Sequence, residues 1–183
     1  MTLRNTLRAA TRQDHDRVDR LGAAFDLARP ADYGAFLQAH AAVLPAFEAS
    51  LDLAPPEDLP PDWPQRRRAR ALAADLAALG LGPALAASQA TLPTRPTRLG
   101  ALYVLEGSRL GGAVLRRALS TAQPDAPDAY LAHGEGLLLW RSFLLWLDNQ
   151  PLDAEETQAA ILGARQVFSA FETAFEAVSA PVR

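Results

Sequence analysis

The chain has 183 residues, of which 49% are hydrophobic and 21% charged, a composition typical of one globular domain with a single core. The net charge of −3 argues against a nucleic-acid-binding protein, whose domain is normally basic. The absence of cysteine excludes disulfides, thiolate metal ligands and iron–sulfur clusters. No segment is apolar enough for a signal peptide or a membrane span. We therefore expect one cytoplasmic domain, residues 1–183, that binds neither nucleic acid nor membrane.

Apolar residues recur at three- and four-residue steps along most of the chain, and no segment shows the alternation typical of a strand. The sequence therefore predicts an all-α fold. Residues 53–64 are rich in proline and are expected to form a surface loop. The expected helices cover residues 3–21, 30–51 with a bend at Pro45, 65–79, 97–119, 134–147 and 153–179.

The helix expected over residues 97–119 carries glycine where the rest of the chain uses alanine. Each interior glycine costs about 1 kcal/mol of helix stability, so Gly107, Gly111 and Gly112 together cost roughly 3 kcal/mol. Gly100, Val104, Gly107 and Gly111 are spaced by four, three and four residues, which places them on one nearly bare face. Such a face permits close approach to the backbone, and the glycines permit a kink. The pattern fits a ligand platform and tight helix packing equally well.

His15 lies on the apolar stripe of the first expected helix, with Asp19 one turn later. Asp19 can accept a hydrogen bond from the imidazole and so orient the other ring nitrogen as a metal ligand. Arg8 and Arg12 flank the histidine and suit anionic groups such as propionates. A core histidine and a solvated basic face are the alternatives.

Two stretches of the chain resemble haem oxygenases. The stretch LRAATRQDHDRVDRL, residues 7–21, resembles the proximal helix, in which a threonine precedes the haem-ligating histidine by four residues. The stretch LGALYVLEGSRLGGAVL, residues 99–115, resembles the distal helix, particularly of bacterial members, including those paired with bacteriophytochromes. The resemblance implies a single-domain, multi-helix bundle that holds haem between the proximal helix and a glycine-kinked distal helix.

The same resemblance implies roles for individual residues. His15 matches the proximal iron ligand, and Asp19 falls at the position of its acidic partner. Gly107, Gly111 and Gly112 match the distal glycines that lie against the macrocycle.

Positively charged and phenolic side chains match the positions that hold the haem propionates. Arg8 falls at the basic position that pairs with one propionate, and Arg12 lies beside it. Tyr103 and Arg141 fall near positions that help to hold the propionates.

Ser108 is a departure from the animal enzymes, which have an aspartate that organises water at this position. A serine hydroxyl can hold a water molecule but carries no charge. Either Arg109 or a carbonyl freed at a kink helps to organise the water, or turnover is slower. Bacterial relatives also lack the aspartate.

The function implied by the resemblance is the cleavage of haem b to biliverdin, CO and Fe²⁺, with O₂ and with electrons from a reductase or ferredoxin. A bacteriophytochrome is a candidate receiver of the biliverdin. One alternative is a haem-binding carrier or sensor of the same fold that does not turn over. A thiaminase-like protein would need a cysteine, and a di-iron protein would need several facing carboxylates and histidines. A helical interaction module without a ligand is the remaining alternative.

The remaining histidines and the arginine clusters receive simpler interpretations. His40 is expected in the core and His133 in an exposed turn. The run from Arg66 to Arg70, or the pair Arg116 and Arg117, is expected to be solvated and to help dock an acidic electron donor.

Overall fold

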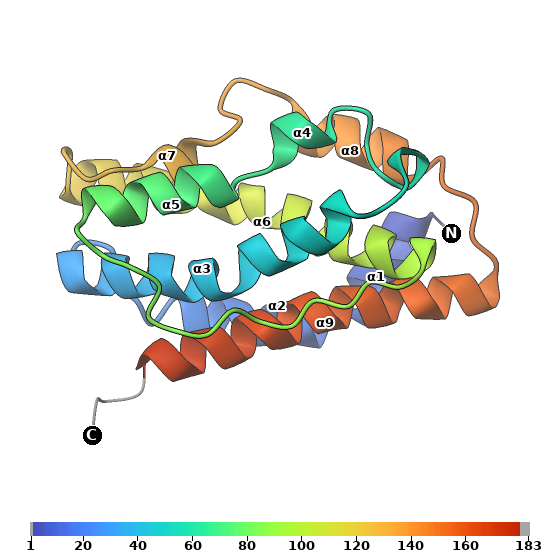
Figure 1. Cartoon of the computed structure of the whole chain (residues 1–183), viewed down its shortest axis with the longest axis horizontal. Coiled ribbons are helices and arrows are strands. Elements are labelled where there is room, and N and C mark those ends of the chain that lie inside the picture. The colour runs from blue at the N-terminus through green and yellow to red at the C-terminus, as the bar shows by residue number, and fades with distance from the viewer. Residues whose placement is uncertain (1, 180–183) are drawn as a thin grey trace.

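The computed structural model describes residues 2–179, which form helices joined by turns and loops, with no strand in that range. The all-α prediction is confirmed (Figure 1). In chain order the elements are α1 (Leu3–Ala10), α2 (Arg12–Gly22), α3 (Pro30–Asp52), the 3₁₀ turn η1 (Pro56–Asp58), α4 (Trp63–Arg66), α5 (Ala69–Ala78), α6 (Arg95–Ala122), α7 (Ala129–Ala132), α8 (Leu139–Leu147) and α9 (Ala154–Ser179). No helix among these residues is long and apolar enough to cross a membrane.

Helix α9 is the element on which the rest of the bundle is assembled. It packs against α6, α3, α2 and α1, and Figure 1 shows it running along the length of the molecule. Apolar residues that recur along α9 are buried or partly buried: Ile161, Val167, Phe168, Phe171, Phe175 and Val178. Many apolar residues of α3 are buried as well, and α3 continues through Pro45.

Two neighbouring faces of α9 receive α6 and α2. Ala160 and Gly163 lie directly against the start of α6, whereas Phe168 and Glu172 contact α2. These pairs are separated by about a third of a turn around the helix axis and by about two turns along it, because each residue advances about 100°. Helices α2 and α6 therefore lie on different sides of α9.

The first predicted helix is divided at Thr11 into α1 and α2. The buried Thr11 hydroxyl donates to the carbonyl oxygen of Leu7 at 2.8 Å, and its backbone has left the helical conformation, with φ −110° and ψ 12°. A hydroxyl bonded to the carbonyl four residues earlier bends helices, so the helix expected over residues 3–21 is wrong at this position.

The helix predicted over residues 65–79 is also divided, because a side chain from α3 caps α5. The Glu48 carboxylate accepts from the backbone N–H groups of Arg68 at 2.7 Å and Ala69 at 3.1 Å. These donors would otherwise be unsatisfied at the start of a helix. The short helix α4 precedes the break and begins inside the predicted loop over residues 53–64.

The fifth predicted helix starts five residues late, at Leu139 instead of Gly134. Gly134 and Gly136 have φ values of 81° and 74°, which belong to the left-handed region and end helical geometry. The preceding short helix α7 was not predicted. Asp75 of α5 fixes its first turn by accepting from the N–H groups of Ala129 and Tyr130 at 3.1 and 2.8 Å.

Candidate functional site

His15 lies on α2 with an exposed and oriented imidazole. Its Nδ1 is 3.1 Å from Asp19 Oδ2, as the one-turn spacing predicted, and 59% of the side chain is exposed. The ring meets Phe168 of α9 edge-on at 6.0 Å between centroids. Asp19 accepts from Nδ1–H, so Nε2 is the nitrogen available to an incoming metal. The core-histidine alternative is therefore wrong for His15.

Helix α2 is fastened by ion pairs on its flank, because none of its residues is fully buried. Arg17 bridges Asp14 at 2.5 Å on the same helix and Glu172 of α9 at 3.2 Å. Arg165 of α9 donates to the carbonyl oxygen of Ala10 at 3.0 Å and so holds the junction between α1 and α2. These contacts position His15 beside α9 and leave the opposite side of α2 open.

The glycines of α6 serve two different purposes. A methyl group built on Gly100 would lie 1.8 Å from the carbonyl oxygen of Ala160, so Gly100 permits the close crossing of α6 and α9. A methyl group on Gly111 would meet no atom within 4 Å, and one on Gly107 would meet only the Trp140 ring at 3.6 Å. Helix packing explains Gly100, and the open face belongs to Gly107 and Gly111.

The open face of α6 continues into exposed apolar side chains. Leu110 is 54% exposed and Val114 is 64% exposed, while Gly112 lies against Leu131. Helix α6 runs unbroken from Arg95 to Ala122, so the expected release of backbone groups at the glycines is not seen in this state. The result is a narrow, apolar helix surface that can receive a flat apolar ligand.

Two of the predicted anion-binding residues, Arg8 and Tyr103, are close to each other. Burial raises the pKa of Tyr103, and the nearby charges of Arg8 and Arg4 oppose that increase, which places both arginines close to the phenol. The Tyr103 ring is 6.0 Å from Trp140, whose neighbour Arg141 is exposed on α8. Arg4 was missed in the sequence, although it lies one turn before Arg8.

Arg12 is exposed on α2, beyond the break at Thr11. No carboxylate of the described residues pairs with Arg8, Arg12 or Arg141. Their charges are therefore available to an anion.

Ser108 does not face open space with a free hydroxyl. Its Oγ donates to the carbonyl oxygen of Leu105 at 2.8 Å and accepts from Arg68 Nη2 at 2.9 Å. The single hydroxyl proton is therefore already used. Ser108 can still accept one further hydrogen bond, but it cannot donate one without rearrangement.

Arg109 is likewise committed to a buried network behind α6. It pairs with Glu106 at 2.9 Å, donates to the carbonyl oxygen of Arg66, and lies 3.1 Å from His133 Nδ1. Because a guanidinium only donates, Nδ1 of His133 must be the unprotonated acceptor. Burial, with the Arg109 charge second, lowers the pKa of His133. His133 lies in a turn, as predicted, and caps the end of α7, but the predicted exposure is wrong because its side chain is half-buried. Arg109 is not free to organise water.

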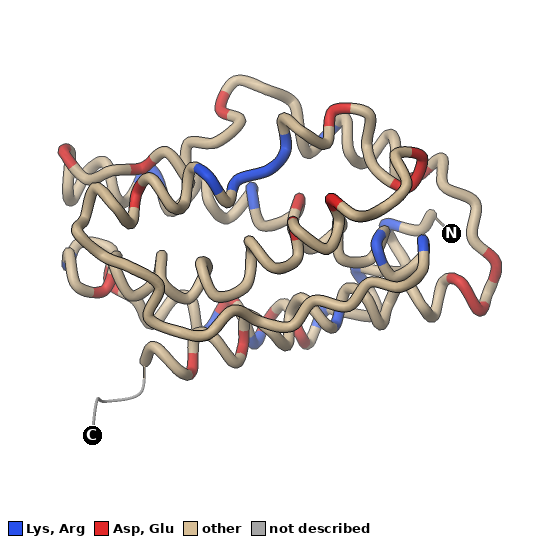
Figure 2. Tube along the Cα trace, in the orientation of Figure 1, with Lys and Arg blue, Asp and Glu red and all other residues tan. Residues whose placement is uncertain are grey.

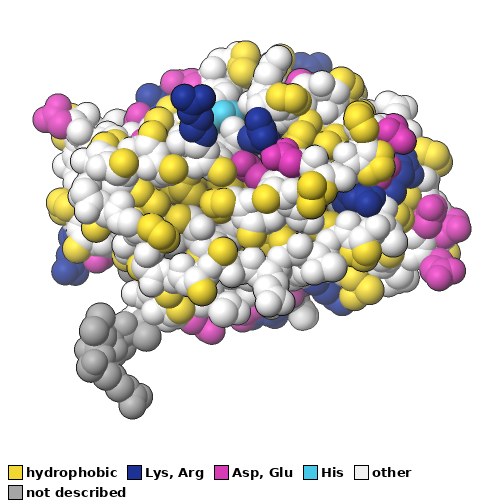
Figure 3. Space-filling view, in the orientation of Figure 1, with side chains coloured by type: hydrophobic (Ala, Val, Ile, Leu, Met, Phe, Trp, Pro, Cys, Tyr) yellow, Lys and Arg dark blue, Asp and Glu magenta, His cyan; other side chains and the backbone are white. Residues whose placement is uncertain are grey.

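The arginine run from Arg66 to Arg70 is a basic stretch of the trace between α4 and α5 (Figure 2), but it is not one solvated surface. Arg66 is 1% exposed and pairs with Glu106 at 2.5 Å, while Arg68 is 5% exposed. Arg67 pairs with Asp52 at 2.8 Å. Around α4 and α5 the surface alternates acidic and basic side chains (Figure 3). The expected basic docking patch at this run is therefore wrong.

The pair Arg116 and Arg117 is only partly available for docking. Arg116 is paired with Asp128 at 2.7 Å and with Glu135. Arg117 is exposed.

His40 lies in the core as predicted, among Phe36, Tyr130, Phe171 and Phe175. Its Nδ1 is 2.9 Å from the carbonyl oxygen of Phe36. Burial lowers the pKa of His40 to about 4, so this imidazole is neutral at ordinary pH.

No cluster of three or more histidine and carboxylate side chains within residues 2–179 could hold a bare metal ion. His15 offers one nitrogen ligand, so a metal at this position needs its other ligands from a non-protein group. A metal macrocycle with acidic substituents fits three features described here: one oriented imidazole, an apolar bare helix face, and exposed arginines that no carboxylate of the described residues pairs with.

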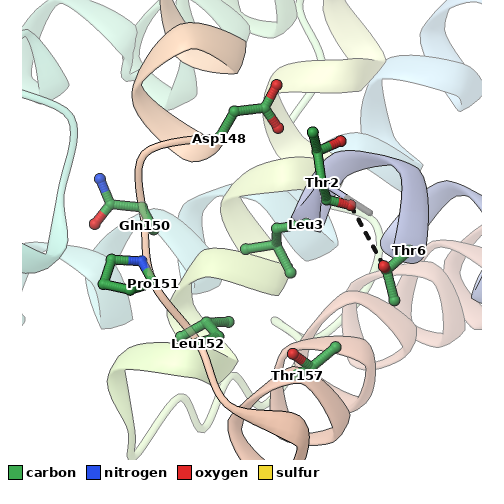
Figure 4. Close-up of a pocket in the computed structure, with 8 residues that line it drawn as sticks. All are labelled: Thr2, Leu3, Thr6, Asp148, Gln150, Pro151, Leu152 and Thr157. Atoms are coloured by element: carbon green, nitrogen blue, oxygen red, sulfur yellow. Dashed lines mark hydrogen bonds between the residues drawn. The ribbon is translucent and has the colours of Figure 1, made fainter.

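A surface pocket elsewhere on the molecule has no such features. It lies between the start of α1 and the connection from α8 to α9, where Thr2, Asp148 and Thr157 are among its lining residues (Figure 4). None of the predicted site residues lines it.

These features are those expected of a helical protein that binds a metal macrocycle. The family profile described as "Heme oxygenase" matches residues 1–177. A relative named heme oxygenase from Xanthomonas campestris pv. campestris (strain 8004) is 34% identical over 152 residues, covering 81% of this chain and 92% of the relative. The chain therefore belongs to the haem oxygenase family, whose members are oxidoreductases that degrade haem.

Two solved structures have the same fold. The NO- and CO-bound heme oxygenase from Neisseria meningitidis superposes with a TM-score of 0.80 at 25% identity, covering 97% of this chain and 92% of that one. The heme oxygenase from Leptospira interrogans gives a TM-score of 0.76 at 20% identity, covering 97% and 100%. The predicted haem-oxygenase-like helical fold is confirmed.

Proposed function

We propose that this protein is a haem oxygenase that cleaves haem b to biliverdin, CO and Fe²⁺, using O₂ and external electrons. The observation that carries the proposal is the pairing of His15, oriented by Asp19, with a helix whose Gly111 face is open. The absence of cysteine excludes covalent thioether attachment, which agrees with the b type.

His15 holds the iron through Nε2 in this proposal. The Asp19 carboxylate fixes the ring tautomer by accepting from Nδ1–H, and it keeps the imidazole electron-rich. When bound, haem supplies the redox and oxygen chemistry, and the protein supplies orientation and electrostatics. Phe168 limits rotation of the imidazole from the α9 side.

The bare face of α6 would lie against the bound macrocycle. Gly107 and Gly111 would allow the helix backbone to approach it closely, because no atom fills the space beside Gly111. Leu131 lies beside Gly112 and therefore borders this surface. Ser108 contributes an acceptor at this helix, because its own proton is directed to the carbonyl oxygen of Leu105.

The propionates would be held near Tyr103, which lies close to positive charge. Arg8 would supply the main positive charge. Arg12 and Arg141, which are exposed on α2 and α8, are the further arginines that the resemblance assigns to this role. Arg4 belongs to the same group because its charge also reaches Tyr103. Arginine suits this role because its planar fork binds carboxylates in a bidentate manner.

The electrons come from a reductase or ferredoxin, and a bacteriophytochrome is the receiver that the resemblance suggests for the biliverdin. With Arg66 and Arg68 buried, and with Arg8, Arg12 and Arg141 assigned to the propionates, the exposed Arg117 is the better docking position for an acidic donor.

A non-catalytic haem carrier or sensor is the second candidate function. The observation in its favour is the Ser108 hydroxyl, whose proton is used inside the protein and which therefore cannot donate to a distal ligand. A carrier would bind haem through the same residues without degrading it.

One spectroscopic experiment distinguishes these functions. Purified protein is titrated with hemin and then supplied with ascorbate or a ferredoxin system in air. Loss of the Soret band with the appearance of biliverdin absorption supports the enzyme, and an unchanged spectrum supports the carrier. Absence of stoichiometric haem uptake contradicts both.

The His15→Ala variant tests the ligand. It should still take up haem weakly, but it should lose the histidine-ligated spectrum and nearly all biliverdin formation. His133→Gln is the matched control, because it removes a histidine from outside the cleft while keeping a side chain that can accept from Arg109. Normal turnover by His15→Ala would rule out the assignment.

A further inference from the structure

Arg68 places a buried positive charge behind the glycine segment of α6 without a carboxylate partner. The residue is 5% exposed, and no carboxylate oxygen of residues 2–179 lies within 4.0 Å of its guanidinium. The other two buried arginines of this region, Arg66 and Arg109, are both paired with Glu106. Buried arginines are normally paired because desolvation of an isolated charge is costly. The exception at Arg68 therefore needs an explanation.

The guanidinium of Arg68 is aimed at one turn of α6. Its Nη2 donates to the carbonyl oxygen of Leu105 at 2.7 Å and to Ser108 Oγ at 2.9 Å. Its central carbon lies 5.3 Å from the centre of the Tyr130 ring. The Leu105 carbonyl also accepts from Ser108 Oγ, so these groups form a closed triangle. Arg68 thus fixes the direction in which the Ser108 hydroxyl points.

The charge of Arg68 reaches other groups around it. Burial is the main cause of the lowered pKa values of His40, His133 and Arg109, and the Arg68 charge lowers each of them further. Glu48 of α3 is an acidic group close enough for the Arg68 charge to lower its pKa, and its carboxylate accepts from the backbone N–H of Arg68. The titratable or charged groups around Arg68 are Glu48 and His40 from α3, Arg66 from α4, Glu106 and Arg109 from α6, Tyr130 from α7, and His133 after it.

We propose that Arg68 is a positioning residue of the haem site, which orients Ser108 and supplies a fixed positive charge behind the distal face. This inference rests on the proposed function, because it requires the ring to lie on the open face of α6. A charge one helix diameter away, about 10 Å, still acts through a protein interior of low dielectric constant. It stabilises negative charge that develops on the other side of the helix.

The test is the pH titration of the ferric haem complex, followed by absorbance. The midpoint between its water-ligated and hydroxide-ligated forms depends on nearby charge and needs no turnover. Arg68→Gln keeps hydrogen-bond donors but removes the charge, so the midpoint should rise by about one pH unit. Arg70→Gln is the control, because Arg70 is an exposed arginine two residues along the chain. Its charge is screened by solvent, and the midpoint should move by about 0.3 pH unit or less.

Arg68→Lys distinguishes the effect of the positive charge from the effect of the guanidinium hydrogen bonds. It keeps the positive charge, so its midpoint should stay close to that of the wild type. Equal shifts in Arg68→Gln and Arg70→Gln would overturn the inference. If the wild-type complex shows no histidine ligation by His15, the proposed function itself has failed.

A second variant applies if Arg68→Gln does not fold. Ser108→Asp gives the buried guanidinium a carboxylate partner at the position of the present 2.9 Å contact. The apo protein should then melt at a higher temperature, because a buried cation gains its ion pair. A lower melting temperature would show that Arg68 is not an unpaired charge, and it would overturn the inference.

Discussion

The glycines of α6 give the sharpest test of the site, because the structure predicts opposite effects at two of them. Alanine at Gly111 adds a methyl group that meets no atom within 4 Å, while it removes the helix penalty of glycine. The apo protein should therefore gain about 1 kcal/mol. For a chain of this size, the melting temperature should rise by about 2–4 °C. The same methyl group would occupy the space above the ring, so turnover should fall or the biliverdin isomer should change.

Gly100→Ala should have the opposite effect on stability. Its methyl group would lie 1.8 Å from the carbonyl oxygen of Ala160, so α6 and α9 would have to separate. We expect a loss of about 3 kcal/mol and a melting temperature lower by roughly 6–12 °C. Ala113→Gly is the matched control, because Ala113 is exposed on the same helix and should lose about 1 kcal/mol while haem uptake is retained.

The assays are thermal unfolding of the apo proteins and hemin titration followed by turnover. A stabilised Gly111→Ala variant with impaired turnover would show that this glycine is retained for the ligand at the expense of stability. A Gly111→Ala variant that is destabilised in the apo form, or that forms the same product at the wild-type rate, would refute the reasoning.

Two further predictions concern buried charge and pH. Glu106→Gln leaves Arg66 and Arg109 without their shared carboxylate, and it should cost about 3–5 kcal/mol in chemical denaturation; a loss below about 1 kcal/mol would contradict the buried ion pairs. His40 has its folded-state pKa lowered to about 4 by burial, so below pH 6.5 the unfolded chain binds a proton that the folded protein does not. The His40 contribution to stability should therefore fall by about 2 kcal/mol between pH 8 and pH 5 in urea titrations, and His40→Gln should remove this part of the slope.

The sequence was sufficient for features that depend on local spacing. The four-residue step from His15 to Asp19 predicted their contact, and the periodicity of α9 predicted its buried face. The presence of the long helices could be predicted because apolar residues repeat with the helical period over long segments. The positions of Gly107 and Gly111 on one helix face followed from the same geometry.

Features that depend on contacts between distant segments were not predictable. Glu48 caps α5 from about twenty residues away, and nothing in the local sequence distinguishes it from a surface glutamate. Arg66 and Arg68 have the pattern of a solvated run, yet their partners on α6 lie 37 to 43 residues further along the chain. The spacing of the glycines also could not distinguish Gly100, which packs against α9, from Gly107 and Gly111, which lie on the open face. The sequence of α6 alone does not reveal where α9 lies.

The break at Thr11 has a consequence for affinity. Because the helix containing His15 has no fully buried residue, its attachment combines the partly buried side chains of Val18 and Leu21 with charged contacts, such as the one between Arg17 and Glu172. Any ordering of this segment on ligand uptake subtracts from the observed binding free energy. The strength with which the protein retains its pigment is thus set partly by surface electrostatics on α9, and salt concentration becomes a determinant of how readily the pigment is released.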